Sequence, residues 1–372
     1  MRVAIVTESF LPQVNGVTNS VLRVCEQLQR GGHQAMVIAP GAGLTSWAGA
    51  DVVRVPSMPV PRYGTHRVAW PWPGMAGALR DFRPDVVHLA SPTVLGAQAV
   101  TVADRLGVPC LAVYQTDLAA YAARYRAAAA SRAVWRWLRW VHAQAARTLA
   151  PSRHAVADLQ QHGVPRVHLW PRGVDLARFH PLRRDDALRR ELAGDGSLLV
   201  GYVGRLAAEK QVELLAGVHD LPGVRLVVVG DGPQRVSLER SLPRATFLGL
   251  QQGAALSTVF ASLDVFVHTG PHETFCQAAQ EALASGVPVV APAAGGLLDL
   301  VLDGGNGRLF EPGSQLELRE AVNELAGDPA LRRRLASAAR PSVTRRSWSA
   351  IGDDYLRHCQ DVLRQPGTSL SA

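Results

Sequence analysis

The chain has 372 residues, of which 47% are hydrophobic and 19% are charged. This composition excludes an intrinsically disordered protein and provides enough apolar residues for two domains with separate cores. The formal net charge at pH 7 is +8, and residues 1–175 carry +9 whereas residues 176–372 carry −1.

Cysteine usage and the N-terminal segment predict the cellular compartment. The four cysteines are far apart and form no Cys-x-x-Cys pair, so neither a disulfide framework nor a zinc site is expected. Residues 1–10 run into a short strand without a signal-peptide core, and no apolar run approaches the roughly 18 residues that span a bilayer. These features predict a cytoplasmic protein.

Strand and helix patterns alternate along the first half of the chain. Residues 2–8 read as a buried strand, and residues 19–32 as an amphipathic helix that ends at two glycines. Further apolar strands are expected at 35–40, 51–56, 85–90 and 109–114, and helices at 73–82 and 94–107. This alternation predicts a parallel sheet with helices on both faces.

The same alternation begins again after residues 169–181, which are rich in Pro and Gly. Strands are expected at 198–204, 225–232, 245–250, 264–270 and 288–296. The pattern predicts an α/β protein with two doubly wound Rossmann-like domains, 1–172 and 173–347, facing a central cleft. Residues 348–372 are expected to form a helix that crosses back to the first domain, followed by a tail.

The basic excess of the first half includes residues 124–147, which carry six arginines and three tryptophans. A basic helix with tryptophans is typical of a segment attracted to an anionic membrane surface. The alternative is a solvated helix whose arginines extend over its own core and whose tryptophans are buried.

Several nucleotide-binding classes lack their motifs. No G-x-G-x-x-G follows a strand, since the segment after strand 225–232 has Pro233 where the third small residue is needed, and no Walker sequence occurs. A nucleic-acid binder would mix Lys with Arg in a recognisable module, which is not found.

The segment "YVGRLAAEKQVELL", residues 202–215, places Arg205 just after a strand and Lys210 at the start of an expected helix. Lys210 is the only lysine in the chain. Its retention among so many arginines suggests a role that needs a compact ammonium, such as binding a phosphate. The alternative is that Lys210 lies at a surface position and has no specific role.

The segment "GPHETFCQAAQEALASG", residues 270–286, follows another strand, and a helix is expected to begin near Glu273. The backbone N–H groups of Thr274, Phe275 and Cys276 would then face outward from a positive helix end and bind phosphate or sugar oxygens. Glu281 would lie within roughly 80° of Glu273 and about 12 Å along the same helix. The alternative, if this segment is considered alone, is that Glu273 and Glu281 are two surface carboxylates without a ligand.

At these residues the chain resembles retaining nucleotide-sugar glycosyltransferases of family 4, which have the GT-B fold. The motifs are "GRLAAEK", Glu273-x7-Glu281 and "ALASGVPVVAPAAGG", together with "PQVNGV", "YQTD", "APS", "RGVD" and "VVGDGP", so the resemblance covers essentially the whole chain. The sequences of the segments "ETFCQAAQEALASG" and "YQTDLAAYA" are most similar to those of bacterial GDP-mannose-dependent α-mannosyltransferases, including those that act on phosphatidylinositol mannosides.

The resemblance implies a role for each motif. Arg205 and Lys210 would neutralise the diphosphate leaving group, so that no metal and no cofactor is needed. Glu273 and the amides of Phe275 and Cys276 would hold the donor sugar, and Glu281 the ribose hydroxyls. Gly16, which lacks a Cβ, would let the first domain approach the diphosphate; an ordinary Asn-Gly turn is the alternative.

One position departs from the family pattern. Many members have His before Thr-Asp in the first half, whereas this chain has Gln115, which cannot transfer a proton but can hydrogen-bond a sugar oxygen. Asp117 is expected near the acceptor, or alternatively as a helix cap. The expected route is same-face attack in which the departing phosphate oxygen takes the acceptor proton.

The prediction is a retaining hexosyltransferase that moves mannose from GDP-mannose to a lipid-linked or glycan hydroxyl at the inner face of the plasma membrane. Its expected partners are the nucleotide sugar, the acceptor and, through residues 124–147, an anionic membrane surface, but no nucleic acid. The alternatives are a UDP-sugar donor, a small soluble acceptor, or a non-catalytic nucleotide-sugar or glycan-binding module, which would be expected to lose Arg205, Lys210 or Glu273.

Overall fold

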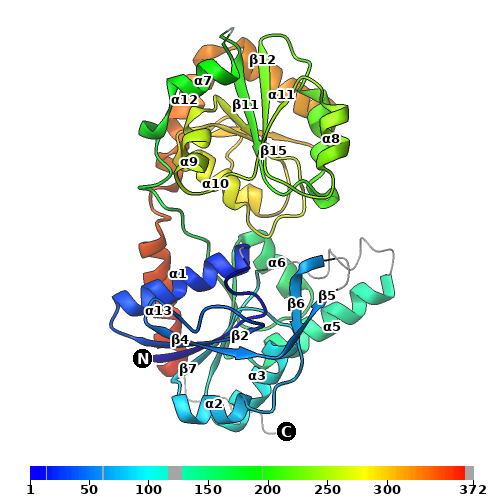
Figure 1. The fold of residues 1–372 in the computed structure, drawn as a ribbon. Helices are drawn as coiled ribbons and strands as arrows, with labels where there is room; N and C mark the ends of the chain where they lie inside the picture. The colour runs from blue at the N-terminus through cyan, green and yellow to red at the C-terminus, as the bar shows by residue number, and fades with distance from the viewer. Residues whose placement is uncertain (14, 61–62, 116–127, 195, 365–372) are drawn as a thin grey trace. The chain divides into compact units, whose positions relative to one another are not determined.

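The computed structural model describes residues 1–13, 15–60, 63–115, 128–194 and 196–364. Within them the chain forms two compact units: unit 1 contains Met1–Arg172 and the C-terminal segment from Trp348 on, and unit 2 contains Gly173–Ser347. Each unit is a mainly parallel sheet with helices on both faces (Figure 1). The predicted pair of Rossmann-like α/β units is confirmed.

Unit 1 is built on a sheet whose described strands have the order β10-β9-β8-β7-β1-β2-β4-β3, and only β3 pairs antiparallel. A separate hairpin consists of β5 and β6. The strands are β1 (Arg2–Val6), β2 (Gln34–Pro40), β3 (Ser46–Trp47), β4 (Ala50–Val55), β5 (Ser57–Val60), β6 (Tyr63–Ala69), β7 (Val86–Leu89), β8 (Cys110–Val113), β9 (Arg147–Ala150) and β10 (Val167–Leu169). The helices are α1 (Gly16–Arg30), α2 (Met75–Phe82), α3 (Val94–Arg105), α5 (Ala128–Gln144), α6 (Arg153–Gln161) and α13 (Trp348–Arg364).

Side chains alternate between the two faces of each strand in unit 1 and so contribute to two separate core layers. Val3 and Ile5 of β1 pack with the apolar faces of α1 and α13, whereas Ala4 and Val6 pack with α2, α3 and α5. Successive side chains of a strand point to opposite faces, so a strand buried on both sides reads as a continuous apolar run. This is why β1 was recognisable from sequence.

Helix α13 completes unit 1 from a distant part of the chain. Its Asp353 accepts a hydrogen bond from Gln27 of α1 at 2.7 Å, and the carbonyl of Ile351 accepts one from the Trp170 indole at 2.9 Å. Gly352 allows the close approach, because a Cβ there would lie 2.5 Å from the Gln27 side chain. The C-terminal helix therefore packs on unit 1, as the sequence predicted.

Unit 2 is built on a parallel sheet whose described strands have the order β13-β12-β11-β14-β15-β16. They are β11 (Leu198–Val203), β12 (Val224–Val229), β13 (Thr246–Gly249), β14 (Val265–Val267), β15 (Val289–Pro292) and β16 (Gly307–Phe310). The α-helices are α7 (Asp186–Leu192), α8 (Arg235–Ser241), α9 (Gly253–Ser262), α10 (Gln277–Ala284), α11 (Gln315–Gly327) and α12 (Pro329–Ala339). Short 3-10 helices are η1 (Pro181–Arg183), η2 (Ala208–Lys210), η3 (Val212–Gly217), η4 (Gly295–Asp299) and η5 (Pro341–Val343).

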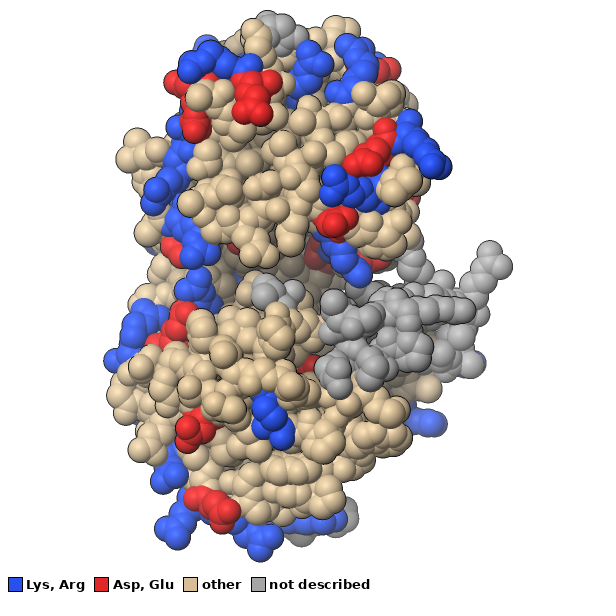
Figure 2. Space-filling model, in the orientation of Figure 1, with Lys and Arg blue, Asp and Glu red and all other residues tan. Residues whose placement is uncertain are grey.

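The core of unit 2 also has two layers. Leu199 of β11 packs with α9 and α10, and Val200 and Tyr202 of the same strand pack with η3, α8 and α11. On the face drawn in Figure 2, basic and acidic side chains lie beside one another over unit 2, whose net charge is near zero. Across the described residues, no helix is both long and apolar enough to cross a membrane.

Candidate active site

The site in unit 2 is assembled at the carboxyl ends of two neighbouring strands. β11 and β14 are parallel and hydrogen-bonded to each other. Arg205 and Lys210 follow β11, and His268 and Glu273 follow β14. The carboxyl ends of parallel strands lie at one edge of a sheet, which is where open α/β sheets bind ligands.

Lys210 and Glu273 form the central ion pair of this edge. Lys210 Nζ lies 2.5 Å from Glu273 Oε1, and Nε2 of His268 lies 3.0 Å from the same oxygen. Burial would raise the pKa of Glu273, but Lys210 and His268 outweigh it and lower this pKa to about 2. Glu273 is therefore an ionised, acceptor-only carboxylate at every physiological pH.

His268 is a member of this site that the sequence reasoning did not identify. It is 2% exposed, and its ring stacks on Tyr202 at a centroid distance of 6.2 Å. Burial alone would lower the pKa of His268, but the neighbouring Cys276 and Glu273 raise it to about 9. The available signal was a histidine placed directly after a buried strand, at the same edge as Lys210.

Two glycines of η4 hold the backbone of the Glu273 loop. The Gly296 amide donates to the Glu273 carbonyl at 2.7 Å. Gly295 has φ +58°, and a Cβ on it would lie 2.5 Å from the same carbonyl. Only glycine fits there without strain. The segment "AAGG", residues 293–296, therefore fixes the position of Glu273 although it lies about 20 residues further along the chain.

The prediction that a helix begins near Glu273 is wrong. α10 begins at Gln277 with Cys276 as its N-cap, so Glu273 lies in the preceding loop, and the amides of Thr274 and Phe275 precede the helix. The physical reason is that the Glu273 carbonyl bonds to Gly296 and does not accept from a following helical turn. Glu273 and Glu281 therefore do not share one helix.

Lys210 and Arg205 also differ from the sequence prediction in detail. Lys210 is the last residue of η2, not the start of a helix, and Gln211 after it has φ 49°. Arg205 follows β11 as predicted, but it forms an ion pair with Glu209, and its side chain is 42% exposed. The structure brings Lys210 to Glu273 and leaves Arg205 beside Glu209.

Glu281 lies on α10 in a different environment from Glu273. Burial raises the pKa of Glu281 to about 8; a hydrogen bond with Gln277 and the charge of Arg178 lower it, and Asp175 raises it further. A carboxyl group with this pKa is mostly protonated at neutral pH and can both donate and accept hydrogen bonds. That property suits a pair of vicinal hydroxyls.

The "VVGDGP" motif packs backbone against backbone on the loop that carries Arg205. A Cβ on Gly230 would lie 1.9 Å from the Gly204 carbonyl oxygen, and one on Gly232 would lie 2.3 Å from the Leu206 carbonyl oxygen. Both glycines have positive φ. These contacts require glycine and explain the motif as a support for the Arg205 loop.

In unit 1, the predicted residues Gly16 and Gln115 are joined by Arg172. Arg172 donates through Nη1 to the Gly16 carbonyl at 2.7 Å and through Nη2 to Gln115 Oε1 at 2.8 Å. Asn15 is the N-cap of α1 and Gly16 its first residue, so the alternative of an ordinary Asn-Gly turn is wrong. Arg172, in the "RGVD" motif, was not singled out from the sequence; Asp117 lies outside the described residues.

Helix α5 carries the described part of the basic, Trp-bearing segment. Leu138 and Val141 are buried, whereas Trp137 and Trp140 are 42% and 46% exposed, and their rings lie 5.3 Å apart. The alternative in which the tryptophans are buried is wrong for this pair. The exposed face of α5 also carries three arginines: Arg132, Arg136 and Arg139.

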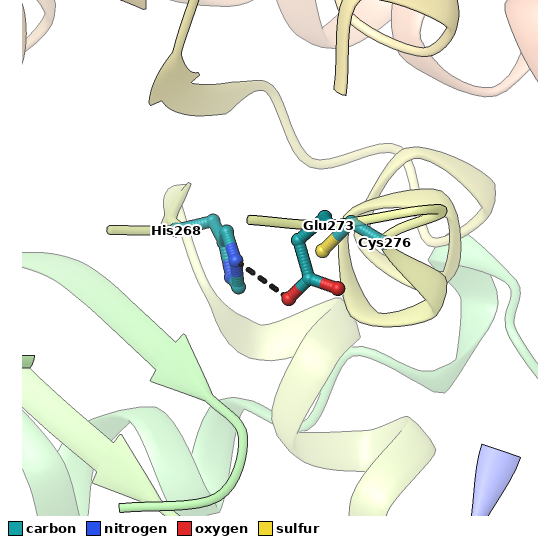
Figure 3. A group of neighbouring side chains, drawn as sticks. All are labelled: His268, Glu273 and Cys276. Carbon is teal, nitrogen blue, oxygen red and sulfur yellow. Dashed lines mark ion pairs between the residues drawn. The ribbon is translucent and has the colours of Figure 1, made fainter. Parts of the chain in front are cut away.

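One group of the described residues offers atoms that suit a metal ion. One ligand atom each from His268, Glu273 and Cys276 lies within 4.8 Å of the others (Figure 3). The imidazole faces the Glu273 carboxylate, and the Cys276 sulfur lies beside the Glu273 side chain. The sequence reasoning expected no metal here.

The fold and the ion-paired edge of unit 2 define a glycosyltransferase with the GT-B architecture. Residues 14–178 match the model of Glycosyltransferase Family 4, and residues 184–341 match that of Glycosyl transferases group 1. The chain belongs to glycosyltransferase family 4, and it is an enzyme, which excludes the alternative of a non-catalytic module.

Particular relatives narrow the comparison. The chain is 50% identical to a GDP-mannose-dependent alpha-mannosyltransferase of Mycolicibacterium smegmatis, over 98% of both chains. It is 29% identical to a GDP-mannose-dependent alpha-(1-6)-phosphatidylinositol dimannoside mannosyltransferase of Mycobacterium tuberculosis, over 81% of this chain and 82% of that one. The fold is similar to the crystal structure of HepE from Anabaena in complex with UDP, with TM-score 0.80 and 19% identity over 97% and 100% of the two chains.

Proposed function

We propose that this glycosyltransferase transfers mannose from GDP-mannose to a hydroxyl group with retention of configuration. The observation that carries the proposal is the Lys210–Glu273 ion pair at the ligand-binding edge of unit 2. Half of the chain's residues are identical to those of a relative whose name specifies this donor and this sugar.

The diphosphate is the group that leaves with the pair of electrons of the bond that breaks. Lys210 brings an ammonium to the carboxyl end of β11, and Arg205 brings a guanidinium to the same loop. Two fixed positive charges stabilise the negative charge that develops on the departing phosphate oxygen. With these charges in place, the proposed reaction needs no metal ion.

Glu273 is proposed to bind the donor sugar. It is ionised, and Lys210 and His268 fix its position through one oxygen, Oε1. A fixed carboxylate accepts hydrogen bonds from sugar hydroxyls and orients the anomeric carbon relative to the leaving group. Glu281, with its raised pKa, is proposed to bind the two ribose hydroxyls of the nucleotide.

The proposed bond changes take place on one face of the sugar. The bond between C1 of mannose and the diphosphate oxygen breaks as the acceptor hydroxyl forms its bond to C1. The acceptor proton passes to the departing diphosphate oxygen, so no protein group has to act as nucleophile or base. Gln115, which cannot transfer a proton, is proposed to hydrogen-bond a sugar oxygen.

The proposed acceptor is a lipid-linked hydroxyl presented at a membrane surface. The exposed face of α5 combines Trp137 and Trp140 with three arginines, and unit 1 carries the whole basic excess of the chain. Arginines are attracted to anionic lipid, and tryptophans favour the interface between headgroups and water. The relative that acts on phosphatidylinositol dimannoside supports a glycolipid of this kind.

A donor panel tests the proposal. Purified protein is incubated with GDP-mannose, GDP-glucose, UDP-glucose and UDP-GlcNAc in turn, with a bacterial membrane lipid extract as acceptor, and released GDP or UDP is measured. The proposal expects lipid-dependent release of GDP from GDP-mannose well above all other donors. A preference for a UDP-sugar would reject the proposed donor while leaving the family unchanged.

A further inference from the structure

His268, Glu273 and Cys276 bring three kinds of ligand atom to one point. His268 directly follows β14, Glu273 comes from the loop held by η4, and Cys276 caps α10. One ligand atom of each lies within 4.8 Å of the other two (Figure 3). Three separate local structures therefore fix the group, which makes it a preformed cluster rather than a chance meeting of flexible side chains.

The histidine of the cluster is poorly satisfied by the protein itself. Its side chain is 3% exposed, and its 3.0 Å contact with Glu273 joins charged groups without the alignment of a hydrogen bond. Among the described residues, neither ring nitrogen of His268 has an aligned hydrogen-bond partner. A metal ion that bonds to one of these nitrogens would supply the missing partner, and His268 and Cys276 would each release a proton to solvent, because the neutral imidazole and the thiolate are the ligands.

The donor set selects a particular class of cation. Imidazole nitrogen, thiolate sulfur and carboxylate oxygen are the ligands of Zn²⁺, whereas Mg²⁺ and Mn²⁺ favour oxygen ligands. Zinc–ligand bonds of about 2.0–2.3 Å place the ligand atoms of a tetrahedral site roughly 3.5 Å apart. The three atoms therefore need to approach one another by only about 1 Å, and a fourth position stays open for water.

Binding of a cation by the three residues would conflict with the contacts that Glu273 makes. Glu273 Oε1 is held at 2.5 Å by the Lys210 ammonium. A dication bonded to Glu273 would repel that ammonium and withdraw the carboxylate from the donor sugar. The same residue cannot serve the cation and the sugar nucleotide together.

We propose that His268, Glu273 and Cys276 form an inhibitory site for a thiophilic divalent cation such as Zn²⁺, whose binding excludes the sugar nucleotide. The competition with donor rests on the function proposed above for Glu273. Binding of the cation does not rest on it, because it depends only on the three ligands. The cation is an inhibitor in this account, and the transfer reaction does not use it.

Binding is tested on the metal-free full chain with Co²⁺ as a spectroscopic probe. We expect one equivalent of Co²⁺ to produce the visible bands of tetrahedral coordination and a thiolate-to-cobalt charge-transfer band, and Zn²⁺ to displace both. Cys276→Ser should remove the charge-transfer band, and His268→Asn should weaken binding at least about tenfold. His272→Asn is the matched control, since His272 is an exposed neighbour outside the cluster and its loss should leave the spectrum unchanged.

Folding of each variant is verified by thermal unfolding, and Cys276→Ala replaces Cys276→Ser if the buried hydroxyl prevents folding. A charge-transfer band that persists in folded variants lacking the Cys276 thiol, or a spectrum with oxygen ligands alone, overturns the site. A second assay measures transfer with added Zn²⁺, and we expect inhibition that EDTA reverses and that rising GDP-mannose relieves. If Co²⁺ binds as expected but inhibition does not respond to the donor, the metal site stands and the role proposed for Glu273 fails.

Discussion

Replacing Lys210 by Met removes the ammonium but keeps an unbranched side chain of similar length. In the parent, Lys210 Nζ lies 2.5 Å from Glu273 Oε1, and the pKa of Glu273 is about 2 instead of 4.5. That difference is worth about 3 kcal/mol in favour of the ionised carboxylate, and the charge of Lys210 is its largest favourable cause. Lys210→Met therefore removes a phosphate-binding charge and loosens Glu273 in one step.

We expect Lys210→Met to lower kcat by at least about 10²-fold, the scale for losing one fixed charge at a leaving group. The pKa of Glu273 should rise toward its ordinary value, although His268 remains beside it. Steady-state kinetics with GDP-mannose measure the first effect, and NMR of carboxyl-labelled glutamate measures the second.

Lys210→Arg is the matched control for Lys210→Met. It keeps the positive charge but replaces a compact ammonium by a planar guanidinium, so its activity should fall between those of the parent and of Lys210→Met. A folded Lys210→Met variant with near-parental kcat would refute the role of Lys210 at the diphosphate. An unchanged pKa of Glu273 would refute the electrostatic coupling.

Four further predictions concern Arg205, the metal requirement, Glu281 and the arginines of α5. Arg205→Ala should lower turnover by about 10²-fold. The parent enzyme should remain active in excess EDTA, and a strict requirement for added Mn²⁺ or Mg²⁺ would contradict the proposed leaving-group chemistry. Glu281 has a folded pKa of about 8, raised above its unfolded value of 4.5, so its contribution to stability is full below pH 4.5 and is lost as the pH rises through 8. Glu281→Gln should thus gain stability relative to the parent between pH 5 and pH 8, by at least about 1 kcal/mol, in urea unfolding; a constant difference across this range would contradict the raised pKa. Replacing the exposed α5 residues Arg132, Arg136 and Arg139 by Gln should weaken binding to anionic vesicles by about 10²-fold, at about 1 kcal/mol per arginine. Slow hydrolysis of the donor should continue in this variant. The control is a variant of unit 2 with the same change of charge, in which Arg183, Arg190 and Arg333 are replaced by Gln, and it should bind as the parent does. Equal binding by the parent and both variants would make α5 a structural helix.

The strands and the residues just after them could be predicted from the sequence because their signals are local. A short apolar run ending in glycine identified β11, and it placed Arg205 and Lys210 at the sheet edge where the structure has them. Continuous apolar runs identified most of the other buried strands in the same way.

The loop at Glu273 could not be predicted because its conformation depends on a distant contact. The Glu273 carbonyl bonds to the Gly296 amide, 23 residues further along the chain, and this contact delays the start of α10 to Gln277. Local helix propensity favours an earlier start, and tertiary packing overrides it. The pairing of Arg172 with Gln115 escaped prediction for the same reason, since the two residues meet only in the folded unit 1.

Short elements were missed for a different reason. The two-residue strand β3, the four-residue strand β5 and the three-residue strand β10 are too short to show a hydrophobic period, and the seven-residue strand β6 contains no continuous apolar run. Their positions depend on the strands that they pair with. None of them contributes a residue to the site of unit 2.

The configuration of the product tests the central claim most directly. The protein is incubated with ¹³C-labelled GDP-mannose and the lipid extract, and the one-bond C1–H1 coupling of the mannosyl product is measured by NMR. The account predicts a mannosyl product whose coupling is that of an α-linkage, the configuration of the donor. A β-linked product, or transfer from a UDP-sugar in preference to GDP-mannose, would contradict it.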